Sequence, residues 1–85
     1  MCSYATQKTA VDGSGKGSTG WFRLRSATVY FDHPYHAPYE HTLNIDFANE
    51  DLGPASRVAV ELSAASAREL VRCIEAALAA AERPD

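Results

Sequence analysis

This 85-residue sequence lacks long apolar runs, clusters of basic residues and the several cysteines of a disulfide-bonded domain. No apolar stretch approaches the about 20 residues that a membrane-spanning helix needs, so we expect no membrane embedding. The eight Lys and Arg residues are scattered and the net charge is -3. That charge argues against nucleic-acid binding, because a basic surface is needed to neutralise phosphates. The first residues, MCSYATQK, contain no apolar segment typical of a signal peptide or lipoprotein leader.

Cysteine and chain length indicate the compartment and the size of the core. Cys2 and Cys73 are too few for the disulfide framework of a small secreted domain, so we expect a reduced, cytoplasmic protein. The length predicts a single domain, residues 1–85, that buries only about 60–65% of its unfolded surface. Cores of this size usually need a disulfide, a metal or a second subunit, and we therefore expect a homo-oligomer.

Alternation of apolar and polar residues predicts four strands, at about residues 3–11, 21–33, 41–48 and 57–63. The segment between the first two, Asp12 to Gly20, contains four of the five glycines and predicts a loop. It lacks the spacing of a Walker phosphate-binding loop, and a strand follows it where that motif requires a helix.

The last third of the chain predicts a helix over about residues 64–82, with Ser63 or Ser66 as its N-cap. Its apolar residues recur every three or four positions: Ala67, Leu70, Val71, Ile74, Ala77, Leu78 and Ala81. Four strands followed by one helix predict an α+β fold. We expect an antiparallel meander sheet of four strands with the C-terminal helix packed on one face.

The second predicted strand carries large apolar side chains on both faces. Those of one parity are Trp21, Val29 and Phe31, and those of the other are Phe22, Leu24 and Tyr30. An antiparallel sheet with one solvated face should alternate more cleanly. A β-bulge near residues 26–28 would exchange the two faces, or a partner subunit would cover the second face.

All three histidines lie within twelve residues, YFDHPYHAPYEH. His33, His36 and His41 have the spacing H-x2-H-x4-H, and Asp32 and Glu40 stand beside them. Imidazoles and carboxylates are the usual ligands of zinc, nickel, copper or iron. His33 and His41 flank the connection between two paired strands, so we expect them to approach each other across the ladder. The pattern predicts a small metal-binding protein, although hydrogen-bonding histidines in an aromatic loop fit it equally well.

Further side chains bear on the same site. Cys2, if it becomes the first residue, offers sulfur and nitrogen as a further metal ligand, or a nucleophile. Three tyrosines flank the histidines and are candidates for a pocket: Tyr30, Tyr35 and Tyr39. A second candidate pocket combines Asn44, Asp46 and Arg25.

Two alternative functions remain beside metal binding. One is an oligomeric interaction or small-ligand-binding module without a metal, in which the histidine and tyrosine segment lines a pocket at a subunit boundary. The other is a small metal-free enzyme that uses a histidine and a tyrosine for acid–base catalysis. The sequence leaves open whether the protein is an enzyme.

Four segments resemble a group of short bacterial proteins of unknown function: MCSY, GSGKGSTGWF, ATVYFDHPYHAPYEHTLNIDF and RVAVELSAASAREL. The resemblance extends over nearly the whole chain. It implies a free-standing bacterial protein, and it implies no activity, cofactor or site residue.

Overall fold

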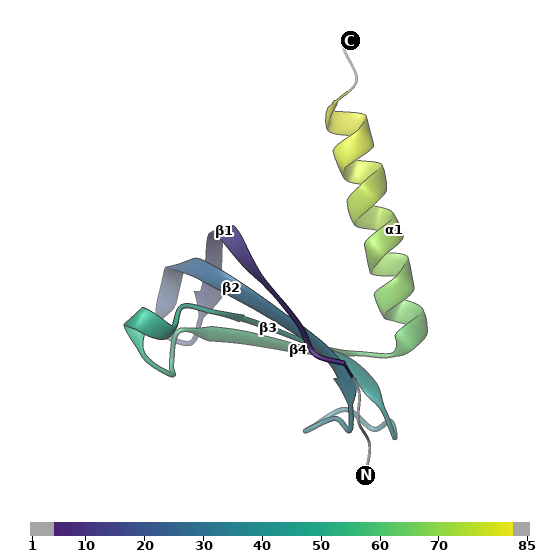
Figure 1. The fold of residues 1–85 in the computed structure, drawn as a ribbon, viewed down its shortest axis with the longest axis horizontal. Helices are drawn as coiled ribbons and strands as arrows, with labels where there is room; N and C mark the ends of the chain where they lie inside the picture. Colours follow the sequence, from purple (N-terminus) through teal and green to yellow (C-terminus); the bar gives the residue numbers. More distant parts are fainter. Residues whose placement is uncertain (1–4, 83–85) are drawn as a thin grey trace.

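The structure, a computed structural model, describes residues 5–82 as a four-stranded antiparallel sheet followed by one helix (Figure 1). The strands pair in chain order and are β1 (Gln7–Gly17), β2 (Gly20–Asp32), β3 (Thr42–Ala48) and β4 (Arg57–Leu62). A short 3-10 helix, η1 (Glu50–Leu52), precedes β4, and α1 (Ala64–Ala81) follows it. The predicted α+β meander with a C-terminal helix is therefore confirmed.

The first strand differs most from its predicted boundaries of 3–11. The glycine segment predicted as a loop forms the second half of β1, and only Ser18 and Thr19 make the turn to β2. Gly20, just after this turn, has φ 120°, a conformation that favours glycine. At Gly15 an added Cβ would lie 3.1 Å from Leu24 Cδ2, so the strand has little room there for a side chain. Composition alone predicted a loop because it does not show that β2 supplies hydrogen-bond partners to these glycines.

The first hairpin contains a β-bulge, but it lies in β1 and leaves the alternation along β2 unchanged. Ala10 pairs with Ser26 and Gly13 with Leu24, so two residues of β1 lie opposite one residue of β2. The predicted position, residues 26–28 of the second strand, was therefore wrong by a few residues and placed in the wrong strand. Beyond the bulge the hairpin bends out of the plane of the other strands (Figure 1), and the Cβ position of Gly15 comes within 3.5 Å of Val58 on β4.

The central part of the sheet has one apolar face and one polar face, because paired strands place the same parity on the same side. Cross-strand neighbours form rows such as Val29, Ile45 and Val60. We call the following set the apolar face: Ala27, Val29, Phe31, Leu43, Ile45, Phe47, Val58, Val60 and Leu62. Ala27 is its one buried member and the others remain partly exposed to solvent.

The helix packs against the sheet through its first turns only. Ser63 is the N-cap, since its Oγ accepts a hydrogen bond of 3.1 Å from the Ser66 amide. Ala64 and Ala67 line a crevice of about 340 Å³ together with Phe31 and Leu43 of the sheet. Beyond this contact α1 projects away from the strands (Figure 1).

The helix therefore carries an uncovered apolar stripe, which consists of Leu70, Val71, Ile74 and Leu78. These side chains are 43%, 56%, 50% and 59% exposed, respectively. Within residues 5–82, no helix is both long and apolar enough to cross a membrane.

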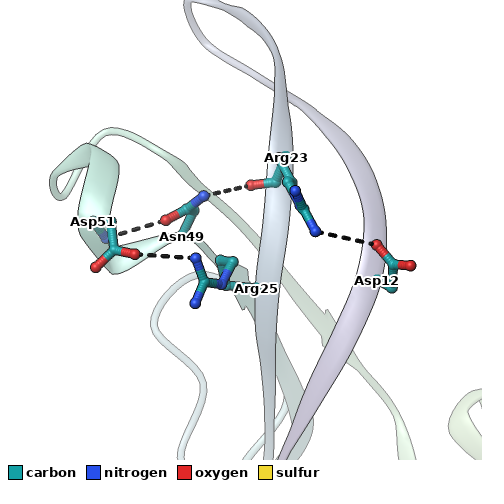
Figure 2. A network of polar contacts seen from close by, with 5 residues as sticks. All are labelled: Asp12, Arg23, Arg25, Asn49 and Asp51. Carbon is teal, nitrogen blue, oxygen red and sulfur yellow. Dashed lines mark hydrogen bonds and ion pairs between the residues drawn. The ribbon is translucent and has the colours of Figure 1, made fainter.

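The end of the sheet farthest from the helix is fixed by a polar network centred on Asn49 (Figure 2). Asn49 is buried, and its Nδ2 donates to the Arg23 carbonyl at 2.9 Å while its Oδ1 accepts from the Asp51 amide at 3.1 Å. Arg25 pairs with the Asp51 carboxylate at 3.2 Å, and Arg23 lies 3.8 Å from Asp12. These contacts join η1 to both strands of the first hairpin.

Candidate functional site

Two of the three histidines meet where β2 ends and β3 begins. The rings of His33 and His41 stack with centroids 4.6 Å apart, and His41 also stacks on Phe31 at 5.8 Å. Phe31 and Leu43 are cross-strand partners, so the next pair outward in this register is His33 with His41. The strand pairing thus produces the approach that the sequence predicts.

The tautomer of His33 follows from its hydrogen bond. Its Nδ1 lies 3.1 Å from the backbone carbonyl oxygen of Glu40. A carbonyl oxygen only accepts, so Nδ1 donates this bond, and in the neutral imidazole Nε2 then carries the lone pair. The carboxylate of Asp32 contacts backbone rather than an imidazole. Its Oδ1 accepts a hydrogen bond of 2.7 Å from the His33 amide, which stabilises the start of the loop.

His36 lies in the middle of the loop, which is tied to β4 by Glu61. The amides of Tyr35, His36 and Ala37 all donate to the Glu61 carboxylate, His36 at 3.0 Å and Ala37 at 2.8 Å. Three successive amides that point at one anion form a concave anion-binding arrangement. Here an internal carboxylate occupies it.

This environment lowers the pKa of the Glu61 carboxyl. The hydrogen bond from the Ala37 amide is the main cause, and partial desolvation opposes it by favouring the neutral acid. The amides of Tyr35 and His36 and the charge of the His36 imidazole lower the pKa further. The carboxylate form of Glu61 is therefore the form that holds the loop in place.

An open groove of about 840 Å³ lies on the polar side of the sheet, beside the loop. We call it the polar groove; its lining residues with polar side chains are Tyr30, His33, Tyr35, His36, Asn44, Asp46, Arg57 and Glu61. Tyr30, Asn44 and Glu61 form one cross-strand row, which alternates with the rows of the apolar face. The groove contains one short ion pair, between Arg57 Nη2 and Asp46 Oδ1 at 2.7 Å.

The two predicted pockets are each formed in part. Tyr30 and Tyr35 line the polar groove, with Tyr35 fully exposed at its edge, whereas Tyr39 is also exposed and lies outside the lining. Asn44 and Asp46 line it as well, but Arg25 does not, because it pairs with Asp51 in the network at the other end of the sheet.

Arg57 and Glu61 are the residues of the groove that sequence reasoning missed. Their parity in the fourth strand, opposite to that of Val58, Val60 and Leu62, places both on the polar face. No pattern in the sequence pairs Glu61 with amides of residues 35–37, because this contact depends on how the loop folds back over the sheet.

The predicted metal-ligand set is brought together only in part. Among residues 5–82 there is no group of three or more His, Cys, Asp or Glu side chains that can hold a metal ion. Cys2 lies outside the described residues. Of the other predicted ligands, Glu40 contacts His33 through its backbone carbonyl. Metal binding and metal-free acid–base catalysis both stay predictions of the sequence.

Comparison with known proteins gives one match. A family model described as a family of unknown function matches residues 1–84. No curated protein and no solved structure matches the chain.

Proposed function

The chain belongs to this family of unknown function (DUF6295), and we propose that it acts as a homo-oligomeric interaction module whose unit is a dimer. A ligand-binding role of the polar groove is part of the same proposal. The observation that carries it is the uncovered apolar surface of residues 5–82, on both the helix and the sheet.

Four large apolar side chains in one stripe are unusual on the surface of a monomer. Single exposed apolar residues are common, but contiguous patches mark sites of association. The stripe of α1 is one such patch, and the partly exposed apolar face of the sheet is a second. Each leaves apolar side chains in water that a partner would bury, and their burial would stabilise the complex.

The total surface supports this interpretation. The chain exposes 6619 Å². A compact monomer of 9.2 kDa is expected to expose about 4,900 Å². The excess is about 1,700 Å² per chain, so two chains could bury up to about 3,400 Å² together, and obligate homodimers begin at about 2,000 Å².

The polar groove lies on the opposite side of the sheet from the apolar face. Association through the apolar surfaces therefore leaves the groove open to a small ligand. The partly buried ring of Tyr30 and the amide, carboxylate and guanidinium groups of the groove are the elements that such sites use for packing and orientation.

Sedimentation velocity over a dilution series tests the proposal. We expect a species of twice the chain mass of 9.2 kDa, which dissociates when Ile74 is replaced in Ile74→Glu. Ala76→Glu is the matched control, since it adds the same charge to the opposite side of the same helix. A wild-type chain that sediments as a monomer at every concentration would refute the proposal.

A second candidate function, metal binding at the histidine segment, is favoured by the hydrogen bond of His33. Donation from Nδ1 to a backbone carbonyl is the outer contact that orients metal-binding histidines, and it leaves Nε2 available. We expect untagged protein to contain metal and its melting temperature to fall with chelator in the wild type. His33→Asn should remove both effects, whereas Tyr39→Phe, in the same loop, should keep them. Metal-free protein whose melting curve ignores added zinc, nickel and copper would exclude this function.

A further inference from the structure

We infer that the dimer forms by reciprocal helix exchange: the apolar stripe of α1 in each chain packs on the apolar face of the other chain. This inference rests on the proposed function, since it requires that the protein associates. It adds which surfaces meet and identifies the occupant of the apolar face as α1 of a second copy.

Each chain carries both halves of a two-layer core, and the two halves are in contact only at one end. An antiparallel sheet with one apolar face is normally covered by a helix with an apolar stripe. Here α1 touches the sheet near Phe31 and Leu43 and then projects away (Figure 1). Within one chain, therefore, the helix does not cover most of the apolar face. Its stripe, which consists of Leu70, Val71, Ile74 and Leu78, stays exposed to solvent.

Reciprocal packing is the symmetric arrangement that covers both surfaces. Two helices that pack stripe to stripe would leave both sheets uncovered. Two sheets that pack face to face would leave both stripes in water. Helix on sheet, repeated by a two-fold axis, buries all four surfaces with self-complementary contacts.

Dimensions and charge fit this arrangement. The 18 residues of α1 extend about 27 Å, and the 7 residues of β3 about 23 Å, so one helix spans the sheet. The apolar face presents aliphatic and aromatic side chains from three strands. The charged residues Glu69 and Arg72, which form an ion pair at 2.9 Å, lie on the opposite side of α1 from Ile74 and would remain in water. Glu75, in contrast, flanks the stripe beside Val71.

The available area also fits this arrangement. The excess surface of both chains, up to about 3,400 Å², exceeds the about 2,000 Å² at which obligate homodimers begin, and such interfaces resemble a domain core cut in two. In many α+β domains a helix packs on a sheet face of the same chain. Here the same kind of packing would form between two chains, as in domain swapping.

The test uses two variants that each damage one surface and two matched controls. Ile74→Glu places a charge in the helix stripe, and Val60→Glu places one on the apolar face. The controls Ala76→Glu and Ala59→Glu add the same charge to the outer side of α1 and to the polar side of β4. Circular dichroism of each variant checks that it is folded.

We expect both damaged variants to be monomers and both controls to be dimers in sedimentation velocity. An equimolar mixture of Ile74→Glu and Val60→Glu should then form a heterodimer. In this heterodimer the intact helix of one chain packs on the intact face of the other, so one of the two contacts is restored.

Other outcomes identify other interfaces. If Val60→Glu remains a dimer, the contact is helix to helix; if Ile74→Glu remains one, it is sheet to sheet; if both do, it involves an edge strand. Each of these results overturns the inference while the proposed dimer stands. A monomeric wild type removes the proposed function and the inference with it.

A measurement on the unaltered chain makes the test independent of whether the variants fold. Isotope-filtered NOE spectra of mixed labelled and unlabelled protein report only contacts between chains. We expect such contacts between methyl groups of Ile74 or Leu78 and those of Ile45 or Val60. Intermolecular contacts confined to helix with helix would overturn the inference.

Discussion

Truncation of Ile74 to alanine should weaken the dimer by an amount that follows from its exposure. The change removes three carbons, whose full burial is worth about 2.4 kcal/mol. Ile74 is 50% exposed in the single chain, so about half of this value, ~1.2 kcal/mol per copy, remains to be gained on association. Two copies per dimer give about 2.4 kcal/mol, or a dissociation constant raised roughly 60-fold.

The stability of the single chain should change little, because Ile74 lies on the projecting part of α1 and alanine is a better helix former. Sedimentation velocity over three decades of concentration gives the dissociation constant of Ile74→Ala and of the wild type. Leu52→Ala is the control, since it truncates a leucine of η1 that is 57% exposed and lies outside both apolar surfaces.

An unchanged dissociation constant for Ile74→Ala would contradict this prediction. Equal weakening of the dimer by Leu52→Ala would contradict it as well, because the effect would then not depend on the stripe. A loss of far-ultraviolet circular dichroism in Ile74→Ala at dilutions where the wild type is also monomeric would show that Ile74 stabilises the single chain instead.

Two further predictions concern the loop and the far end of the sheet. Glu61→Gln should speed hydrogen exchange at the amides of residues 35–37, because it weakens their charge-assisted bonds. Since the folded pKa of Glu61 is lowered, its contribution to stability is present above the unfolded pKa and is lost as pH falls through the folded pKa. At neutral pH, these amides should therefore exchange more slowly in the wild type than in Glu61→Gln. In acid the difference should disappear, because Glu61 is then protonated. Equal rates in the two proteins at neutral pH would contradict this prediction. Asn49→Ala should lower the unfolding free energy by about 1–3 kcal/mol in urea titrations, because the Arg23 carbonyl loses a buried donor. Lys8→Ala, which removes an exposed ion pair, should cost below about 1 kcal/mol, and similar losses in both variants would contradict the assignment.

Local patterns predicted most of the secondary structure. Alternation in Leu43, Ile45 and Phe47 reflects the two-residue period of a strand with one apolar side, and the spacing of Leu70, Ile74 and Leu78 reflects the helical period. Both depend on the backbone geometry of neighbouring residues, so they can be read without knowledge of the fold. The loop predicted for the glycine segment was wrong, because this segment is a strand through its pairing with β2 and not through its composition.

In the histidine segment, too, one feature follows from local patterns and another depends on contacts distant in sequence. Strand pairing predicts that His33 and His41 meet, since both continue a cross-strand pair at the ends of β2 and β3. The position of His36 depends on the loop, and the loop is held by Glu61, which lies 25 residues further along the chain. The sequence contains no signal for this contact, because any acidic residue on the polar face of a neighbouring strand satisfies the same local pattern.

Residue period and composition were sufficient to predict a sheet with one apolar face and a helix with an apolar stripe, because both are properties of each segment alone. The separation of these two surfaces within one chain could not be predicted in this way, since it depends on the direction in which α1 leaves β4 (Figure 1). The same holds for the hydrogen bonds between the Glu61 carboxylate of β4 and the amides of the loop. Both outcomes depend on contacts between segments distant in sequence, whose free energies no local pattern records.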